Sequence, residues 1–532
     1  MSRSKNGRFA MTRSYAMMRW SEFWSSRNVE PTNLLERGPM RALRIALLTA
    51  AVALTALVWP SVASAQFDFT LATFGPQRVT QGRPLYFVVT ATPVSGTSPT
   101  MIPITVAGLP AGATASFPDL AQTCCGTNQL YSMSSPVRTT IMINTLATTP
   151  VGAVTLTITV TAGTVARSVS YPITVTAPPN AFSLQPYAAA SSVPQLALWE
   201  SNMTTYGQTF CTQLTNTSLT FDQKLNTTYY DSQRVFYNIR DYTGGTTWET
   251  CALKAQSIYR DGYVTPNNGQ VPGYWDFPHG IFQSYIRVGD TTSQKAVGLL
   301  SRNAAYGTSS VGNLNGMVSP ALSREIFYHL MAYLFALAAG EPKNPVGEAY
   351  LELTLGYIDQ WFVSKNYVVT GGDVPPAAIG KFYTQPFMVG LAAEALIQYY
   401  ETKSQDVRIP AAVKIAMDWL WANAWNATNQ AFSYDVYGPA IGPYQTSNNN
   451  APDLNLLLAP AFAWLYKQTG DTTYRDRADA IFAGGVTRAC PGCDGKHFNQ
   501  QYRWSFDYLK WRNPSSTGTS SVPAAPTGLS VR

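Results

Sequence analysis

The sequence predicts a multidomain protein in which a β-sandwich precedes an all-α domain. The chain has 532 residues, of which 45% are hydrophobic and 13% charged, so it is long enough for two or three domains and too apolar to be disordered. From Phe67 to about Pro178, apolar and polar residues alternate as in strands. After Ala177-Pro-Pro-Asn180 the hydrophobic period rises to about 3.6 residues, the period of a helix.

The first 65 residues have the features of an export leader. They contain nine of the 37 basic residues and three of the 30 acidic ones, so the rest of the chain has 28 basic and 27 acidic residues. A basic segment from Met40, an apolar run over 45–59 and Ala63-Ser-Ala65 predict a signal peptide over 40–65, after an upstream extension over 1–39. A membrane anchor is the alternative interpretation of the apolar run. The signal-peptide pattern leads us to expect a secreted protein, bacterial extracellular or periplasmic, with no membrane association after cleavage. The balanced charge of the rest of the chain predicts no nucleic-acid partner.

Residues 66–178 contain short β-branched runs separated by turn residues. The runs begin at Leu85, Ile102, Thr139, Val154 and Ser168. This spacing is typical of a sandwich. The stretches over 108–117 and 148–160 resemble the immunoglobulin-like modules of bacterial secreted enzymes. The segment shows no acid/base constellation, so we expect a spacer or docking role for it.

Residues 179–513 repeat one unit, a helix that ends in Gly and a second helix that begins with an Asp cap. Gly289-Asp290 and Gly470-Asp471 are the clearest copies, and looser ones surround Glu341 and Asp406. A further pair over 195–211 and 248–263 and a closing helix near Trp504 give five or six antiparallel hairpins. An open α-solenoid would contain similar hairpins, but its loops are seldom as long and aromatic as these.

The segment from Gly273 to Asp290 carries a family resemblance. Gly273-Tyr-Trp-Asp-Phe-Pro-His-Gly-Ile-Phe-Gln-Ser-Tyr-Ile-Arg-Val-Gly-Asp290 resembles the loop and inner helix of the (α/α) toroids of many glycoside hydrolases and polysaccharide lyases. The resemblance implies a ring of helical hairpins with the substrate site at one end. It also implies a secreted polysaccharide-degrading enzyme that acts on a polysaccharide or oligosaccharide.

The candidate site residues lie at the expected starts of inner helices. The catalytic candidates are Asp276, Glu325 and Asp435, with His279 and Tyr328 beside them. The substrate-binding candidates are Tyr274, Trp275, Arg324, His329, Tyr434, Tyr437, Asn450, Asp453 and Trp504. Aromatic rings stack on sugars, and carboxylates and amides bind hydroxyls. A structural interpretation stays open, because Asp276 can cap a helix and Arg324 can pair with Glu325. The segment 496–507 is expected to close the ring and could contact substrate.

Three functions remain open on the sequence alone. Hydrolysis by paired carboxylates is favoured, because the residues after the leader have a net charge of only +1. That charge predicts no broad basic groove for an acidic sugar. The alternatives are β-elimination, with Arg324, Tyr328, His279 and His329 supplying the required groups, and a non-catalytic glycan-binding scaffold. We expect a monomer with no cofactor, since the sequence has no Gly-rich phosphate loop and no His-Glu-x-x-His helix.

The six cysteines suit an oxidising compartment. Cys490-Pro-Gly-Cys493 predicts a local disulfide rather than a metal site, although His497 could act as a third ligand. Cys211 and Cys251 are expected to form a second bridge, whereas the pairing of Cys124 and Cys125 stays open. Residues 514–532 resemble a linker and the first strand of a truncated fibronectin type III module.

Overall fold

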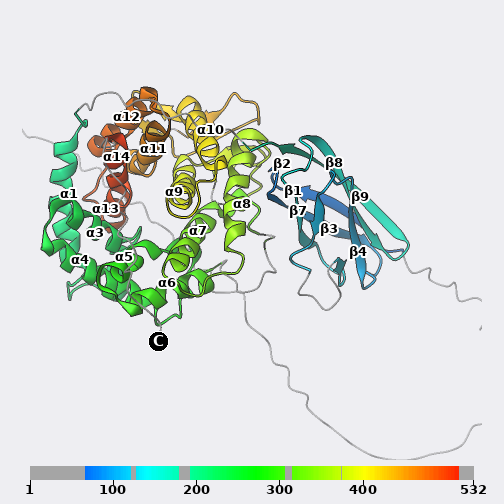
Figure 1. Cartoon of the computed structure of the whole chain (residues 1–532), viewed down its shortest axis with the longest axis horizontal. Coiled ribbons are helices and arrows are strands. Elements are labelled where there is room, and N and C mark those ends of the chain that lie inside the picture. The colour runs from blue at the N-terminus through cyan, green and yellow to red at the C-terminus, as the bar shows by residue number, and fades with distance from the viewer. Residues whose placement is uncertain are drawn as a thin grey trace, which may run out of the picture. The chain divides into compact units, whose positions relative to one another are not determined.

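The computed structural model describes residues 66–120, 128–178, 192–305, 314, 316–372, 374–447 and 449–513. Among these, a β-rich N-terminal region precedes a helical C-terminal region (Figure 1), as the change of period near residue 178 predicts. The upstream extension, the signal segment, the C-terminal tail, Cys124 and Cys125 lie outside the described residues. Within the described ranges, no helix combines the length and apolar composition that a membrane crossing requires.

The N-terminal region contains two sheets that share one apolar core. Its strands are β1 (Asp68–Phe74), β2 (Arg78–Thr80), β3 (Pro84–Ser95), β4 (Ile102–Ala107), β5 (Thr114–Ser116), β6 (Gln129–Leu130), β7 (Val137–Asn144), β8 (Gly152–Ala162) and β9 (Val165–Thr176). One sheet has the order β1-β3-β7-β5 and the other β2-β9-β8-β4-β6, and only the β2–β9 pair is parallel. Alternate residues such as Ile141 of β7 and Ile158 of β8 fill the core between the sheets.

Strand β3 is buried on both faces. Leu85, Phe87 and Val89 pack into the core of the two sheets. Val88 belongs instead to the apolar core of the helical region, and Tyr86 packs against that core. Polar contacts support the same junction, because Asn366 Nδ2 donates to the Gly75 carbonyl at 2.8 Å. A central strand with two apolar faces therefore connects the sheets to the helices.

The helical region consists of helices with short strands in the loops between them. The α-helices are α1 (Leu196–Gln213), α2 (Phe221–Thr227), α3 (Ser232–Thr243), α4 (Thr246–Gln256), α5 (Pro278–Val288), α6 (Thr291–Asn303), α7 (Ser323–Ala338), α8 (Gly347–Ile358), α9 (Pro386–Thr402), α10 (Arg408–Asn423), α11 (Ala459–Thr469), α12 (Thr472–Arg488), α13 (Gly495–Tyr502) and α14 (Ser505–Arg512). π-Helical turns over Ser257–Val264 and Asp359–Val363 extend α4 and α8, and 3-10 turns over Gly273–Trp275, Pro320–Leu322, Pro376–Ala378 and Pro452–Leu457 lie in the loops. The short strands are β10 (Phe382–Thr384), β11 (Trp425–Asn426), β12 (Ala431–Phe432), β13 (Val436–Gly438) and β14 (Gln445–Thr446).

The two clearest predicted hairpin turns have the expected chemistry. After α5, Gly289 has a φ of 69°, and the Asp290 side chain accepts from the Thr292 and Ser293 amides at the start of α6. After α11, Gly470 has a φ of 69° and Asp471 caps α12 by accepting from the Thr473 amide. Glycine adopts this left-handed conformation without the steric cost of a Cβ.

The predicted pairing of the first two helices was wrong. Helix α4 forms its hairpin with α3, which was not predicted, and α1 is joined to α4 by the Cys211–Cys251 disulfide. The apolar signal of α3 is present in the sequence, because Val235, Phe236 and Ile239 recur at helical spacing and are fully buried. The helix also buries Gln233 and Arg234, each 2% exposed.

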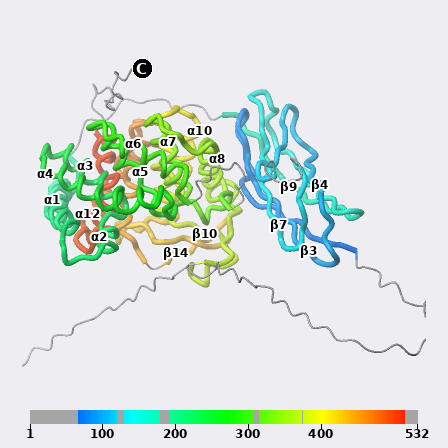
Figure 2. Tube along the Cα trace, turned by 90° about the horizontal axis from the view of Figure 1, so that it is seen from below, coloured from blue at the N-terminus to red at the C-terminus, as the bar shows by residue number. Residues whose placement is uncertain are grey.

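The helices form a closed circuit of contacts. In order, α3, α5, α7, α9, α11, α14 and α13 each contact the next, and α13 contacts α3 again (Figure 1). We call α3, α5, α7, α9 and α11 the inner helices. Antiparallel partners follow each of them, so the inner helices run in the same direction. Figure 2 shows α2, β10 and β14, which precede α3, α9 and α11, along one edge of the helical region.

Candidate functional site

The segments that lead into the inner helices contact one another at one end of the helical region. The Tyr229 ring lies edge-on to Trp275 with centroids 4.8 Å apart, the Arg324 guanidinium lies 5.4 Å from the Tyr274 centroid, and Tyr434 packs on Phe387. We call this end the rim. Its residues are Tyr229, Tyr274, Trp275, Arg324, Glu325, Tyr434, Asp453 and His497.

Two rim tyrosines present ring surface to solvent. Tyr274 and Tyr434 are each 41% exposed. Tyr274 belongs to the 3-10 turn before α5, and the amide of Tyr434 donates to the Asn449 carbonyl at 2.8 Å. The faces of such aromatic rings suit stacking on an apolar ring face.

Arg324 and Glu325 form an ion pair at the start of α7. Arg324 Nη2 donates to Glu325 Oε1 at 2.8 Å and Nε donates to the same oxygen at 3.2 Å. The side chains are 27% and 11% exposed. Burial raises the pKa of the Tyr229 phenol. The charge of Arg324 lowers this pKa and the charge of Glu325 raises it, so the phenol lies close to both charges. Among the predicted acid/base candidates, Glu325 is the one that lies at the rim with part of its side chain, 11%, exposed to solvent.

Asp276 and His329 pair beneath the rim. Asp276 Oδ2 and His329 Nδ1 are 3.0 Å apart, and both side chains are fully buried. Burial raises the pKa of Asp276, against the hydrogen bond and charge of His329. Asp276 Oδ1 and His329 Nε2 have no hydrogen-bond partner among the described residues. The structure thus brings two predicted site residues together, but away from solvent.

His279 lies deeper on α5. Its ring packs on Phe335 with centroids 4.6 Å apart, and its Nδ1 has no hydrogen-bond partner among the described residues. Burial, followed by the charges of Arg234, Arg503 and Arg287, lowers its pKa well below the usual range. The imidazole is therefore neutral at physiological pH.

Tyr328 belongs to a buried ion-pair network between the inner helices. Glu394 of α9 accepts from Arg234 Nη1 at 2.5 Å and from Arg503 Nη2 at 2.8 Å, and all three side chains are 2% exposed. Arg503 Nη1 also donates to the Tyr328 hydroxyl at 3.3 Å. Burial raises the pKa of Tyr328 well above 10, so the phenol stays protonated. The network joins α3, α7, α9 and the end of α13.

Asp435, Tyr437 and Asn450 maintain the loop that carries Tyr434. Asp435 is 3% exposed and accepts from the Ser447 amide at 3.0 Å. Tyr437 pairs with Gln445 between β13 and β14, and Asn450 forms a bridge with Ser433. Their contacts are those of a β-hairpin, and the Asp435 carboxylate is turned to its own backbone.

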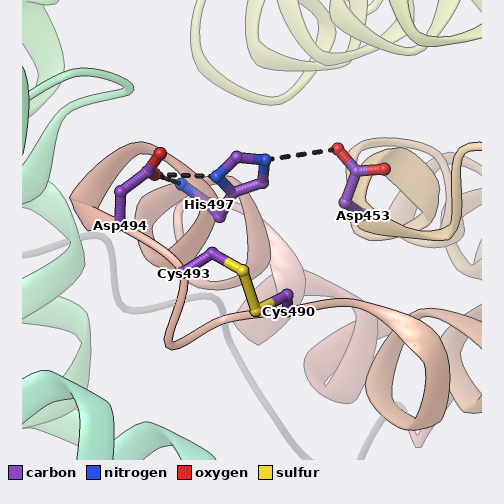
Figure 3. The surroundings of a disulfide bond; sticks show 5 residues. All are labelled: Asp453, Cys490, Cys493, Asp494 and His497. Atoms are coloured by element: carbon purple, nitrogen blue, oxygen red, sulfur yellow. Dashed lines mark hydrogen bonds and ion pairs between the residues drawn. A yellow bond between two sulfur atoms is a disulfide. The ribbon is translucent and has the colours of Figure 1, made fainter. Parts of the chain in front are cut away.

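Asp453 faces a histidine that lies between two carboxylates (Figure 3). His497 Nδ1 is 2.8 Å from Asp494 Oδ1, and His497 Nε2 is 3.9 Å from Asp453 Oδ2. Asp453, Asp494 and His497 are 34%, 55% and 31% exposed. The Cys490–Cys493 disulfide, with sulfurs 2.03 Å apart, precedes Asp494, which caps α13 by accepting from the His497 amide. Both described bridges are those that the cysteine spacing predicted.

Helix α13 connects Asp453 to the rest of the rim. Gln501 Nε2 donates to the Asp453 carbonyl at 2.6 Å, and Asn499 Nδ2 donates to the Tyr229 carbonyl at 2.7 Å. Trp504, also predicted to bind substrate, is 2% exposed and packs edge-on against Trp511.

Sequence reasoning missed two members of this site. Tyr229 precedes a helix that was not predicted, and His497 was considered as a metal ligand and as part of the segment 496–507 that could contact substrate, but not as a partner of Asp453. The available signal was the spacing of Asp494 and His497, because an Asp cap and a residue three positions later lie on the same turn. Among the described residues, no three His, Cys, Asp or Glu side chains are grouped as a metal site requires.

Comparisons with known proteins identify no family for this chain. No protein-family model matches it, and no curated protein matches it. A family 123 glycoside hydrolase from Clostridium perfringens aligns at 10% identity and a TM-score of 0.16, over 26% of this chain and 32% of that one. The α-2-macroglobulins of Salmonella and E. coli align at 12% and 11% identity with TM-scores of 0.28 and 0.27. They cover 84% and 83% of this chain, which spans 27% and 26% of theirs.

Proposed function

We propose that this protein is an exported glycoside hydrolase, in which an immunoglobulin-like module precedes an (α/α) toroid whose rim cleaves a polysaccharide or oligosaccharide. One observation carries the proposal. Exposed tyrosine rings and partly exposed carboxylates occupy the same end of the helical region, in segments that lead into parallel inner helices. Aromatic faces bind sugar rings, and carboxylates supply the proton transfers of glycoside hydrolysis.

Access to solvent distinguishes the two carboxylates. Asp453 is 34% exposed, which suits a base that takes a proton from water. Glu325 is only 11% exposed, and its shielding from water suits an acid that protonates the leaving oxygen of the sugar once the substrate replaces its contact with Arg324. In this assignment the bond from the anomeric carbon to the leaving oxygen breaks, water adds to that carbon, and each carboxyl group exchanges one proton.

The phenols and imidazoles support hydrolysis over elimination. A lyase needs a base strong enough to remove a ring proton next to a carboxylate. Burial raises the pKa of Tyr328, and both His279 and His329 lie beneath the rim rather than on it. Of the groups that the sequence offered for elimination, Arg324 lies on the rim, whereas the candidate bases are a protonated phenol and two imidazoles beneath it.

A panel of neutral and acidic polysaccharides tests the proposal. We expect reducing ends to appear with at least one of them, and Glu325→Gln and Asp453→Asn each to lower kcat by about 100-fold or more. Asp476→Asn is the matched control, because this carboxylate is 63% exposed on α12 and pairs only with the neighbouring Arg475 in the structure. It should keep full activity.

The same panel distinguishes the competing functions. Products with the ultraviolet absorbance of an unsaturated uronate would show that the protein cleaves by elimination and not by hydrolysis. Retention of a glycan without any new reducing ends, unchanged in Glu325→Gln, would indicate a glycan-binding protein instead.

A further inference from the structure

His497 is placed to act on Asp453 rather than on substrate. Its Nδ1 is 2.8 Å from Asp494 Oδ1, so the neutral ring carries its proton on Nδ1 and directs Nε2 toward Asp453. The distance from Nε2 to Asp453 Oδ2 is 3.9 Å, which is an ion-pair distance once the ring is protonated (Figure 3). Asp494 is also fixed, because it accepts from the His497 amide at 2.8 Å.

The surroundings of the imidazole favour its charged form. The hydrogen bond to Asp494 raises the pKa of His497 above its usual range, and the charge of Asp453 adds to this effect. Partial burial and the neighbouring Lys496 act in the opposite direction. Asp494, Asp453 and Lys496 are the charged groups of the described chain that act on this ring, two from the start of α13 and one from the turn before α11.

We propose that His497 is a positioning residue that, oriented by Asp494 and positively charged, holds the Asp453 carboxylate turned to the rim for water activation. This inference rests on the proposed hydrolase function and extends it by one residue. In the step, a water proton passes to Asp453 while the water oxygen bonds to the anomeric carbon. Glu325 protonates the leaving oxygen, and His497 keeps its proton throughout. The atoms and charges therefore balance without any further reactant.

The coupling between His497 and Asp453 can be measured without any substrate. The charge of Asp453 raises the pKa of His497, so the titration of the imidazole reports on their contact. The chain has three histidines, and in a protein labelled at the imidazole carbons His497→Gln identifies the signal by its loss. We expect Asp453→Asn and Asp494→Asn each to lower the pKa of His497. Lys496→Gln is the control with opposite sign, and it should raise that pKa slightly.

Activity then tests what the coupling does. Positioning requires the charged ring, and the pKa of His497 lies above its usual range. Wild-type kcat/KM should therefore have an alkaline limb that follows the pKa of His497, and this limb should be absent in His497→Gln. Asp494→Asn keeps the helix cap but not the charge, so it should move this limb to lower pH. Equal melting temperatures would show that both variants are folded.

Three results would overturn the inference. One is a His497 pKa that Asp453→Asn leaves unchanged, and another is an alkaline limb that persists in His497→Gln while Glu325→Gln is inactive. In both cases the hydrolase proposal survives. Absence of any new reducing end with wild-type protein on the whole panel would reject the hydrolase proposal, and this inference with it.

Discussion

At the scale of single residues, two buried carboxyl groups of the helical region make opposite contributions to the pH dependence of stability, because one of them is paired with arginines. Burial raises the pKa of Asp276. Above the unfolded value of about 3.9, the native state therefore binds more protons than the unfolded one, and stability falls as pH rises toward the native pKa. In Asp276→Asn we expect this loss to disappear. Relative to wild type, the variant should gain stability between pH 4 and neutrality in urea unfolding.

The His329 contact provides the control for this prediction. Asn at 276 can still accept from His329 Nδ1, whereas Asp276→Ala leaves that buried nitrogen unpaired. We expect the Ala variant to lose about 1–3 kcal/mol at all pH values. Equal stability of Asn and Ala variants would show that the 3.0 Å contact contributes nothing.

Glu394 should show the opposite sign. Burial raises its pKa, but Arg503 and Arg234 outweigh burial and the net shift is downward. Its stabilisation is therefore present above the unfolded value of about 4.3 and is lost as pH falls through the native pKa. Glu394→Gln removes the carboxylate to which both buried guanidinium groups donate and leaves Arg234 only Asp507, 3.7 Å away, so it should cost about 3–5 kcal/mol at neutral pH and less in acid. A cost that does not change with pH in urea unfolding would contradict this account.

The positions of candidate site residues at helix starts were easier to predict than the exposure of their side chains. The sequence placed Tyr274, Arg324 and Glu325 at helix starts, and the structure has them in contact at the rim. It could not distinguish these from Asp276, Asp435 and Trp504, which follow the same local pattern but are 0%, 3% and 2% exposed. Burial depends on neighbours far away in the chain, such as His329 for Asp276, and no local pattern contains them.

At the scale of elements, local chemistry predicted helix ends better than helix partners. Gly289-Asp290 and Gly470-Asp471 fix their turns through backbone conformation and capping, which adjacent residues determine. Helix α3 was not predicted, although Val235, Phe236 and Ile239 recur in it at helical spacing. Its packing partners are not contained in any local pattern, because its buried Arg234 pairs with Glu394, 160 residues away.

The two described disulfides differ in the elements that they join. Cys211–Cys251 links α1 to α4 across 40 residues, whereas Cys490–Cys493 closes a turn of three. Loop-closure entropy predicts a cost of about 4 kcal/mol for replacing the first pair with Ala and about 2 kcal/mol for the second. Urea unfolding of the two double variants measures the difference. A larger loss for the second pair would show that it acts through the native turn before Asp494, not through the unfolded chain.

At the scale of the whole molecule, strand β3 makes the two regions interdependent. Val88 is 4% exposed and belongs to the apolar core of the helices, while its neighbours Phe87 and Val89 belong to the core of the sheets. The alternation of apolar and polar residues along the strand predicted one apolar face. It could not show that the helices cover the other face of β3 as well. Burial on both faces implies that the sheets and the helices unfold together.

Val88→Asp tests this cooperativity by placing a charge at the junction. In the chain from residue 66 onward, every tryptophan lies after residue 178, so tryptophan fluorescence of that chain follows only the helical region, whereas far-ultraviolet circular dichroism follows both. In wild type we expect the two signals to change at the same urea concentration. A buried, unpaired carboxylate should cost about 2–4 kcal/mol and separate the two transitions. Val94→Asp, at a position of the same strand that is 62% exposed, is the matched control and should leave them coincident. Coincident transitions in Val88→Asp would mean that the strand's second face does not couple the two regions.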